Sequence, residues 1–427
     1  MKLRAYAKII GKGEIEELFA LSERLSLKSM LHINSTAVGG GVAEILNRLV
    51  PLLNDIGIDA RWSVMKGGEE FFRVTKSFHN ALQGAPVKIG KDTFEIYLKY
   101  NRMNAENFSF DRDVTVIHDP QPAALIDMQN NGKWIWRCHI DISTGPRYRP
   151  AFELIGVRRY IKKALLSQTR VWKFLKRYIR RYDASMFSAA AFSRAGLNIP
   201  QFLVPPSIDP LSDKNRELKE QEIDKVLDKH GISREKPIIA QIGRFDRFKD
   251  PMGVIDAYKI VKKRIDCQLI LAGGTATDDP EGIEMFQEVK KEAMGDRDIH
   301  VIILPPFSDL EVNVFQTAAS VVLQKSLKEG FGLTVSEALW KSTPVVGGAV
   351  GGIPSQIMNG INGYLIHSTE GAANRIMYLL RNPEHAKRLG QNGREYVKQR
   401  FLLTRHLRDY LLIMHSLEHP RESFIQL

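Results

Sequence analysis

Short, almost continuously apolar runs alternate with segments of helical periodicity along most of the chain. Runs of this kind predict the strands of parallel sheets, because helices bury such strands on both faces. A helix is predicted over "VAEILNRLVPLLNDIG" (42–57), and further helices are predicted around 382–417. The predicted strands are 29–35, 59–65, 114–119, 134–140 and 184–190, followed by 237–243, 267–274, 299–306, 320–326 and 343–348.

The predicted strands fall into two successive sets, which indicates an α/β chain of two Rossmann-like, doubly wound domains. Prolines end a strand at "VPPSIDPLSDKN" (204–215), and the polar stretch that follows marks the joint. We expect a first domain over 1–208, a second over 209–400, and a C-terminal helix within 401–427 that returns toward the first domain. Ligands of such sheets bind beyond the carboxyl ends of the strands, so the loops there are where a site is expected.

The composition is that of a protein that folds in water: 44% of the 427 residues are hydrophobic and 26% are charged. No apolar run reaches the roughly 18 residues that a transmembrane helix needs, and the N-terminal residues lack an apolar signal core. The two cysteines, Cys138 and Cys267, suggest neither a disulfide framework nor a metal cluster. These features predict a cytoplasmic protein.

The net charge of +12 comes from one segment rather than from the whole surface. Between Arg147 and Arg181 the chain has 12 Lys or Arg residues and one acid, Glu153, whereas the remaining residues have 49 bases and 48 acids. Three interpretations stay open: a helix that packs an apolar stripe on the core, a helix that binds a membrane surface or another polyanion, and a positive field that attracts an anionic substrate. The stripe consists of Ile161, Leu165, Trp172, Leu175 and Ile179.

Glycines follow the first predicted strand. In "NSTAVGGGVAEIL", Gly39, Gly40 and Gly41 stand between that strand and a helix, where a backbone without side chains can approach a ligand and helix N–H groups can bind an anion. The stretch matches neither GxGxxG nor a Walker loop. Alone it is as consistent with a tight strand-to-helix turn as with a phosphate or sugar contact.

Histidine and aspartate residues follow two further strands of the first domain. "VTVIHDPQP" ends one strand with His118 and Asp119, and "WRCHIDIS" ends the next with Arg137, His139 and Asp141. Each residue alone is commonly a helix cap or a satisfied core group, but two such clusters at one sheet edge favour a polar site. The histidines lack HExxH or CxxC spacing, and no metal site is predicted.

Cations and carboxylates occupy the corresponding loops of the second domain. In "QIGRFDRFKD", Arg244 and Lys249 follow a strand, and two cations in one loop suit a diphosphate. In "SLKEGFGLTVSEALW", Glu329 lies in a loop and Glu337 on the helix that follows. A carboxylate accepts hydrogen bonds from two neighbouring hydroxyls, so a ribose diol matches Glu337, while the loop amides match sugar hydroxyls or phosphate oxygens.

The order of these residues resembles the family 4 retaining glycosyltransferases of GT-B architecture. The resemblance rests on the Arg244 and Lys249 pair, on the E-x7-E pattern of Glu329 and Glu337, and on "AVGGIPSQIMNGINGYLI" (349–366). It implies two Rossmann-like domains that face a central cleft. From about residue 29 to 415 the chain is similar to the trehalose glycosyltransferring synthases and the related trehalose phosphorylases, through "HINSTAVGGGVAEIL", "FFRVTKSFHNALQG", "VIHDPQPA", "WRCHIDIS" and "PPSIDPLSDKN".

The resemblance implies a role for each matching residue. Arg244 and Lys249 would neutralise a nucleoside diphosphate leaving group without a metal ion. Glu329 would hold the transferred glucose, Glu337 would bind the ribose, and His118 would contact the donor sugar. The further donor-binding residues would be Gly40, Gly41, Gly330, Phe331, Gly332, Leu333 and Thr334, and the acceptor-binding residues would be Arg137, His139 and Asp141.

The implied reaction transfers glucose with retention from a nucleoside diphosphate glucose to glucose and forms trehalose. No confident carboxylate nucleophile is present, since Asp119 and Asp141 are better interpreted as positioning groups, so front-face substitution is the preferred mechanism. The family usually has glycine after the motif lysine, whereas this chain has Asp250, which either reshapes phosphate binding or caps the next helix. The sequence leaves the donor base, the reversibility and the oligomeric state open, a homodimer being one option.

The expected partners are the small-molecule substrates, with no tightly bound cofactor and no nucleic acid. Membrane contact through 147–181 is not favoured. Three alternatives are a trehalose phosphorylase, in which inorganic phosphate would leave Glu337 without a ribose, a membrane-surface glycosyltransferase with a lipid or other acceptor, and a non-catalytic nucleotide or polyanion-binding protein. The combination of Arg244, Lys249, Glu329 and Glu337 argues against the last.

Overall fold

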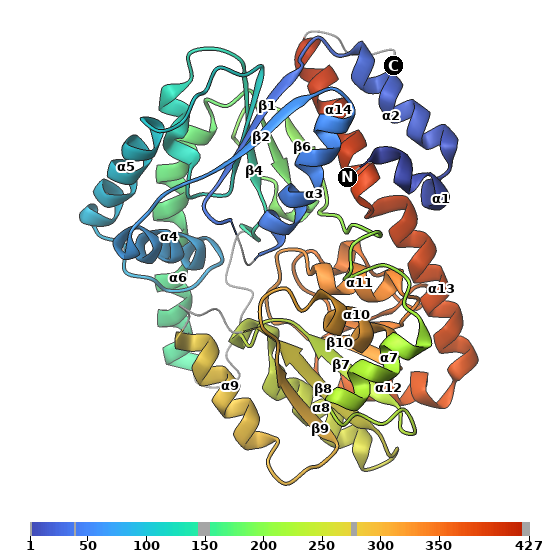
Figure 1. The fold of residues 1–427 in the computed structure, drawn as a ribbon. Coiled ribbons are helices and arrows are strands. Elements are labelled where there is room, and N and C mark those ends of the chain that lie inside the picture. The colour runs from blue at the N-terminus through green and yellow to red at the C-terminus, as the bar shows by residue number, and fades with distance from the viewer. Residues whose placement is uncertain (1, 38–39, 144–153, 275–279, 421–427) are drawn as a thin grey trace. The chain divides into compact units, whose positions relative to one another are not determined.

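Two β-sheets, each of six parallel strands, organise the chain (Figure 1). The computed structural model describes residues 2–37, 40–143, 154–274 and 280–420. Unit 1 consists of Met1–Pro206 with Thr404–Leu427, and unit 2 of Ser207–Leu403. The sequence-based limits were 208 and 400. The predicted fold class, two Rossmann-like sheets in an α/β chain, is confirmed.

Unit 1 is built on a sheet with the strand order β2-β1-β3-β4-β5-β6, and all its strand pairs are parallel. The strands are β1 Ser29–Asn34, β2 Asp59–Val64, β3 Val114–His118, β4 Lys133–Cys138, β5 Ala184–Phe187 and β6 Gln201–Leu203. The helices are α1 Ala7–Ile10, α2 Lys12–Arg24, α3 Gly41–Asp55, α4 Glu69–Leu82, α5 Lys91–Ala105, α6 Leu154–Ile179 and α14 Leu403–Glu418.

The two faces of this sheet differ in chemistry. One face packs Trp134, Trp136 and other apolar side chains against α4, α5 and α6 in a continuous core. Helices α2, α3 and α14 lie on the other face (Figure 1). That second face holds buried polar groups, among them His32 and Arg137. Alternation of side chains along the strands separates the two sets.

Helix α14 is tied to the N-terminal part of unit 1 by hydrogen bonds. His415 Nε2 lies 3.0 Å from the carbonyl oxygen of Leu21. Glu418 accepts hydrogen bonds from the backbone N–H groups of Ser26 and Leu27, both at 2.6 Å. These contacts join residues almost 400 positions apart and explain why the C-terminal helix belongs to unit 1.

Helix α6 carries the described part of the basic segment, since residues 147–153 lie outside the described ranges. The predicted core stripe is partly wrong, because Leu165 is 40% exposed. Leu175 and Ile179 are buried as predicted. With about 3.6 residues per turn, the buried stripe continues from them through Val171, Gln168 and Ala164, and Leu165 falls about 100° away from it. Ala164 and Gln168 were not predicted to be buried, because neither is a large apolar residue.

Unit 2 is built on a sheet with the strand order β12-β11-β10-β7-β8-β9, again with parallel pairs. The strands are β7 Ile238–Ile242, β8 Gln268–Gly273, β9 Ile299–Ile303, β10 Val321–Gln324, β11 Val345–Gly348 and β12 Tyr364–Ile366. The helices are α7 Glu220–Lys229, α8 Pro251–Lys262, α9 Pro280–Glu292, α10 Asp309–Ala318, α11 Leu333–Trp340, α12 Thr369–Arg381 and α13 Pro383–Arg400.

Helices cover both faces of the second sheet as well. Helices α8, α9 and α12 enclose one apolar core with the strands, while α10 packs on α7 and α11, and α11 on α13. The predicted strands of both sheets are confirmed. Strand β12 was not predicted, because it has only three residues and follows the glycine and asparagine of a turn.

Candidate active site

Glu329 lies in the loop between β10 and α11, and three side chains of unit 2 bind its carboxylate. Lys249 Nζ forms an ion pair with Glu329 Oε2. Gln324 Nε2 and Ser326 Oγ each donate to the same oxygen at 3.2 Å. A loop carboxylate and a loop cation predicted from two separate motifs are therefore neighbours, and both stand at the carboxyl edge of the sheet, where ligands bind.

Glycines make room for this loop. Gly332 has φ 82° and ends the approach to α11, a conformation that favours glycine. Gly351, with φ 57°, packs so closely on the loop that a Cβ there would overlap the carbonyl oxygen of Glu329. The "AVGG" part of the second motif thus supports the Glu329 loop directly, which gives a physical reason for its glycines.

Lys249 ends a short 3-10 helix, Arg247–Lys249, that follows β7. Asp246 begins this turn by accepting a 2.7 Å hydrogen bond from the N–H of Phe248. Gln241 Nε2 donates to the carbonyl oxygen of Lys249 at 2.7 Å. The backbone that carries the lysine is held from both sides, so its ammonium group is directed at Glu329.

Asp250 occupies the position where glycine was expected, and the structure gives its role. Its backbone is left-handed, with φ 52° and ψ 52°, a region that glycine adopts freely and that aspartate tolerates better than most residues. The side chain caps α8 by accepting from the N–H of Gly253 at 3.2 Å, and it pairs with Lys325. The carboxylate is therefore already neutralised by a cation of the neighbouring loop.

Arg244 differs from Lys249 in its surroundings. Its side chain is 62% exposed, and its Nη2 lies 3.8 Å from Oδ2 of Asp246. An exposed guanidinium in the β7–α8 loop is accessible to a bound anion. The structure brings Lys249 and Glu329 together, whereas Arg244 follows the same strand as Lys249 but stays exposed.

Glu337 is buried on α11 and bound by two groups of unit 2. Gln316 Nε2 donates to Oε2 at 2.8 Å, and Lys214 Nζ lies 3.7 Å from Oε1. An ionised carboxylate has about four acceptor positions, so lone pairs remain for further hydroxyl donors. Binding of a ribose by Glu337 stays a prediction.

The remaining predicted donor residues line the start of α11. Phe331 is buried and packs on Phe401, with ring centroids 5.4 Å apart. Thr334 Oγ1 donates to the carbonyl oxygen of Ile242 at 3.2 Å, so its hydroxyl fastens the helix to β7. Gly330 precedes Phe331 in the loop, and Leu333 is the first residue of the helix.

In unit 1 the predicted histidines form a hydrogen-bonded series with a third histidine. His32 Nδ1 lies 3.0 Å from His118 Nε2, and His118 Nδ1 lies 3.0 Å from His139 Nε2. Asp119 Oδ1 accepts from the backbone N–H of His139 at 2.7 Å. Both ring nitrogens of His118 are thus engaged, and the predicted contact of His118 with the donor sugar would require one of these bonds to be exchanged.

Burial dominates the protonation of this cluster. It lowers the pKa of His32 to about 3 and the pKa values of His118 and His139 well below the usual range. The neighbouring histidines and the Arg137 guanidinium add to the effect. Burial also raises the pKa of Asp119 to about 6, against the N–H of His139 and the charge of Arg137, which lower it. The three imidazoles are therefore neutral at pH 7.

Arg137 and Asp141, predicted to bind the acceptor, are held by protein groups. Arg137 is fully buried and donates to the carbonyl oxygen of Val204. Asp141 Oδ1 accepts from the N–H and the hydroxyl of Ser143, at 2.9 and 2.5 Å. Their contact with an acceptor stays a prediction, as does that of His139.

The glycine loop leads into α3. Gly40 precedes the helix and Gly41 is its first residue, while Gly39 lies outside the described residues. The Gly40 carbonyl accepts the first helical hydrogen bond, from the N–H of Glu44 at 3.1 Å. The start of this helix has space, since a Cβ on Gly40 would meet nothing within 4 Å.

Among the described residues, one group of three side chains has the spacing of metal ligands, namely His415, Glu418 and His419 on and after α14. Two of them already bind the backbone of unit 1, through Leu21 and through Ser26 and Leu27. The group lies far along the chain from every predicted site residue.

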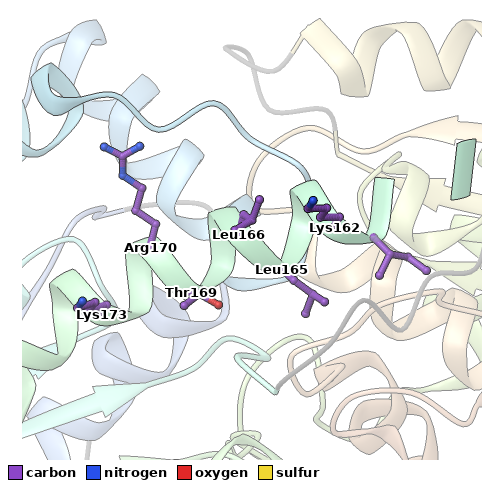
Figure 2. A pocket seen from close by; sticks show the side chains of 7 residues that line it. Lys162, Leu165, Leu166, Thr169, Arg170 and Lys173 are labelled. Carbon is purple, nitrogen blue, oxygen red and sulfur yellow. The ribbon is translucent and has the colours of Figure 1, made fainter. Parts of the chain in front are cut away.

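The exposed side of α6 carries cations and two leucines. Leu165 and Leu166 are 40% and 61% exposed and lie among Lys162, Arg170 and Lys173 (Figure 2). Helix α6 has no acidic residue from Leu154 to Ile179. No helix in the described part of the chain is long and apolar enough to cross a bilayer.

Several residues of these clusters were not found from the sequence. Lys325, Gln324 and Ser326 follow directly from the "LQKS" end of β10, and their polarity at the end of an apolar strand was the available signal. His32 was a histidine within the apolar run "SMLHINS". A histidine within a buried strand, together with histidines at the ends of the next two strands of the sheet, is the pattern that would have revealed it.

Comparisons with known proteins match both units. The family models "Trehalose synthase, N-terminal domain" and "Glycosyl transferases group 1" match residues 32–194 and 222–396. The trehalose synthase of Thermococcus litoralis is 44% identical over 421 residues, which cover 97% of each chain. A trehalose phosphorylase of Pleurotus pulmonarius is 28% identical over 412 residues, which cover 85% of this chain and 54% of that protein.

The solved structures with the same fold include GT-B glycosyltransferases. One, described as "Trehalose-6-phosphate from E. coli bound with UDP-2-fluoro glucose", has a TM-score of 0.70 at 12% identity and covers 90% of this chain and 98% of its own. A sucrose-phosphate synthase from Thermosynechococcus elongatus has a TM-score of 0.69 at 19% identity and covers 92% and 100%. At these identities the likeness concerns the fold.

Proposed function

The chain belongs to the trehalose synthase family of GT-B glycosyltransferases, and from this premise we propose that it transfers glucose from a nucleoside diphosphate glucose to glucose, with retention, to form trehalose. Unit 2 binds the nucleotide sugar and unit 1 recognises the acceptor. The reaction needs no metal ion or tightly bound cofactor. The two free cysteines, both buried, suit a reducing cytoplasm.

The observation that carries this proposal is the Lys249–Glu329 pair. A carboxylate accepts hydroxyl hydrogen bonds, and an ammonium group binds phosphate oxygens. Since the two groups are hydrogen-bonded to each other, a sugar held by Glu329 has its phosphate within reach of Lys249. A glucosyl diphosphate presents these two parts next to each other across one bond.

The mechanism follows from these charges. As the bond between the sugar and the diphosphate breaks, negative charge develops on the leaving oxygen, and Lys249 and Arg244 stabilise it there. The sugar passes through an oxocarbenium-like state held by Glu329. The acceptor hydroxyl attacks from the face that the diphosphate leaves, a phosphate oxygen takes the hydroxyl proton, and the α configuration is retained. Glu337 binds the ribose of the donor.

The donor is tested by supplying one leaving group at a time. The chain is incubated with glucose and either UDP-, ADP-, GDP- or TDP-glucose or α-glucose 1-phosphate, and release of nucleoside diphosphate or phosphate is measured. Nucleoside diphosphate release that depends on glucose supports the proposal. Turnover of glucose 1-phosphate alone would instead support a phosphorylase, the activity named for the Pleurotus relative.

A second candidate acceptor is a lipid at an anionic membrane surface, and the exposed Leu165 and Leu166 on the basic helix α6 favour it. Co-sedimentation with phosphatidylserine vesicles at low salt, compared with Leu166→Glu, decides this. Equal recovery of both proteins with the vesicles, or of neither, would remove this candidate.

A further inference from the structure

Three histidines of unit 1 lie in or directly after neighbouring strands of the sheet, each two residues nearer the carboxyl edge than the one before. In the register of the strands, His32 on β1 pairs with Val116 on β3, and His118 stands two residues further toward the carboxyl edge. His118 in turn pairs with Arg137 on β4, and His139 stands two residues further again. Steps of two keep all three side chains on one face of the sheet. We call His32, His118 and His139 the histidine row.

The row runs from the interior to the edge where ligands bind. His32 is fully buried, His118 is 2% exposed, and His139 is partly exposed. The two hydrogen bonds of the row, each 3.0 Å long, use four of its six ring nitrogens. The two others are His32 Nε2 at the inner end and His139 Nδ1 at the outer end. His139 Nδ1 is therefore the ring nitrogen that these bonds leave unused at the partly exposed end of the row.

The protons of the row have only two arrangements. A neutral imidazole carries one N–H, so His118 donates to one neighbour and accepts from the other. If the hydrogen bonds point inward, His32 carries its proton on Nε2. That atom is buried and has no hydrogen-bond partner among the described residues, so an N–H there would be left unpaired. If they point outward, His32 donates from Nδ1, His118 donates from Nδ1, and His139 presents Nδ1–H.

We infer that the histidine row points outward and presents Nδ1–H of His139 as a fixed hydrogen-bond donor to a hydroxyl oxygen of the acceptor sugar, with His32 and His118 as positioning residues. Asp119 fixes the backbone of His139, because its Oδ1 accepts a 2.7 Å hydrogen bond from the His139 N–H. The identity of the sugar rests on the proposed function, whereas the direction of the hydrogen bonds does not. His118 thereby positions His139 through the 3.0 Å hydrogen bond between them.

The direction of the row is tested without any assay of activity. Long-range proton–nitrogen correlation spectra of the histidine-labelled wild-type protein distinguish rings protonated at Nδ1 from rings protonated at Nε2. The expected result is the Nδ1–H pattern for His118, whose signals are assigned by their change in His32→Asn. An Nε2–H pattern for His118 in the folded wild-type protein would overturn the inference.

The role in acceptor binding is tested with two substitutions at one site. Asparagine places an amide near the position of the imidazole Nδ1, so His32→Asn retains a donor to His118, whereas His32→Leu fills the space without one. His32→Leu is expected to raise KM for glucose roughly 3–10-fold, the worth of about one hydrogen bond, with KM for the nucleotide sugar unchanged. His32→Asn is expected to stay within about twofold of wild type.

If KM for glucose rises equally in His32→Leu and His32→Asn, or if only KM for the nucleotide sugar changes, the role of His32 is purely structural and the inference is contradicted. If the wild-type protein makes no trehalose from any nucleotide sugar, the proposed function fails while the spectra still decide the direction of the row. The two failures are therefore distinguishable.

Discussion

Removing the Lys249 ammonium group is the perturbation that bears most directly on the chemistry. Lys249→Ala deletes the cation that pairs with Glu329 and that the mechanism places at the leaving diphosphate. Loss of one preorganised group that stabilises transition-state charge costs roughly 100–1,000-fold in kcat. We expect a loss of that size, because Arg244 in the same loop retains part of the positive charge.

The effect on stability is expected to be modest. After the substitution, Glu329 keeps its hydrogen bonds from Gln324 and Ser326. A partly buried carboxylate that loses one partner costs about 1–3 kcal/mol, and each kcal/mol lowers Tm by about 2–4 °C in a domain of this size. Thermal melting should therefore show a folded variant, and kcat is measured from nucleoside diphosphate release at saturating substrates.

A matched control comes from the opposite edge of the same sheet. Lys262 pairs with Asp298 and Asp266, both at 2.5 Å, just before strands β8 and β9 begin. Lys262→Ala removes an ion-paired lysine of unit 2 far from the loops that hold the predicted site and should leave kcat within about twofold. A folded Lys249→Ala protein with kcat within about threefold of wild type, or an equal loss in Lys262→Ala, would refute the charge-stabilisation argument.

Three further substitutions test the structural account. Gly351→Ala should lower Tm by more than Gly360→Ala, although both glycines have a positive φ. A Cβ at Gly351 would overlap the backbone of Glu329, whereas a Cβ at Gly360 would have its nearest neighbour 3.9 Å away. Equal Tm values for the two variants would contradict this packing. Asp119→Asn should raise Tm above pH 6, where the wild-type carboxylate is charged and partly buried. The gain in unfolding free energy, at most about 3 kcal/mol, should vanish as the pH falls toward 4; a gain that is independent of pH would refute it. Glu337→Gln should raise KM for the nucleotide sugar roughly 10–100-fold, the worth of hydrogen bonds to a charged group, with KM for glucose unchanged; kinetics equal to wild type would exclude the ribose contact.

The fold could be predicted because apolar patterning in parallel sheets is simple. Strands such as Ile238–Ile242 are buried on both faces, and their sequences are almost continuously apolar, Gln241 being the exception here. The position of the site could also be predicted, since loops at the carboxyl ends of such strands share one edge. Glu329 and Lys249, which are 80 residues apart, meet there as that rule requires.

Other parts of the site depend on contacts between residues far apart in the sequence, which no local sequence pattern indicates. The bond between Lys325 and Asp250 joins residues 75 positions apart, and neither residue alone indicates the other. The position of His32 in the histidine row depends on the register of β1 against β3, which one sequence does not reveal. Leu165 was misplaced because large apolar residues were counted as the core stripe of α6, whereas the buried stripe includes Ala164.

The central claim is that this chain joins two glucose units through a nucleotide-linked donor. The most direct measurement is carbon NMR of the product formed from unlabelled nucleoside diphosphate glucose and glucose labelled at carbon 1. The account predicts a single disaccharide with both anomeric carbons in the α linkage, the label at one of them, and one nucleoside diphosphate released per disaccharide. A product with another linkage, or no product while glucose 1-phosphate is turned over, would contradict it.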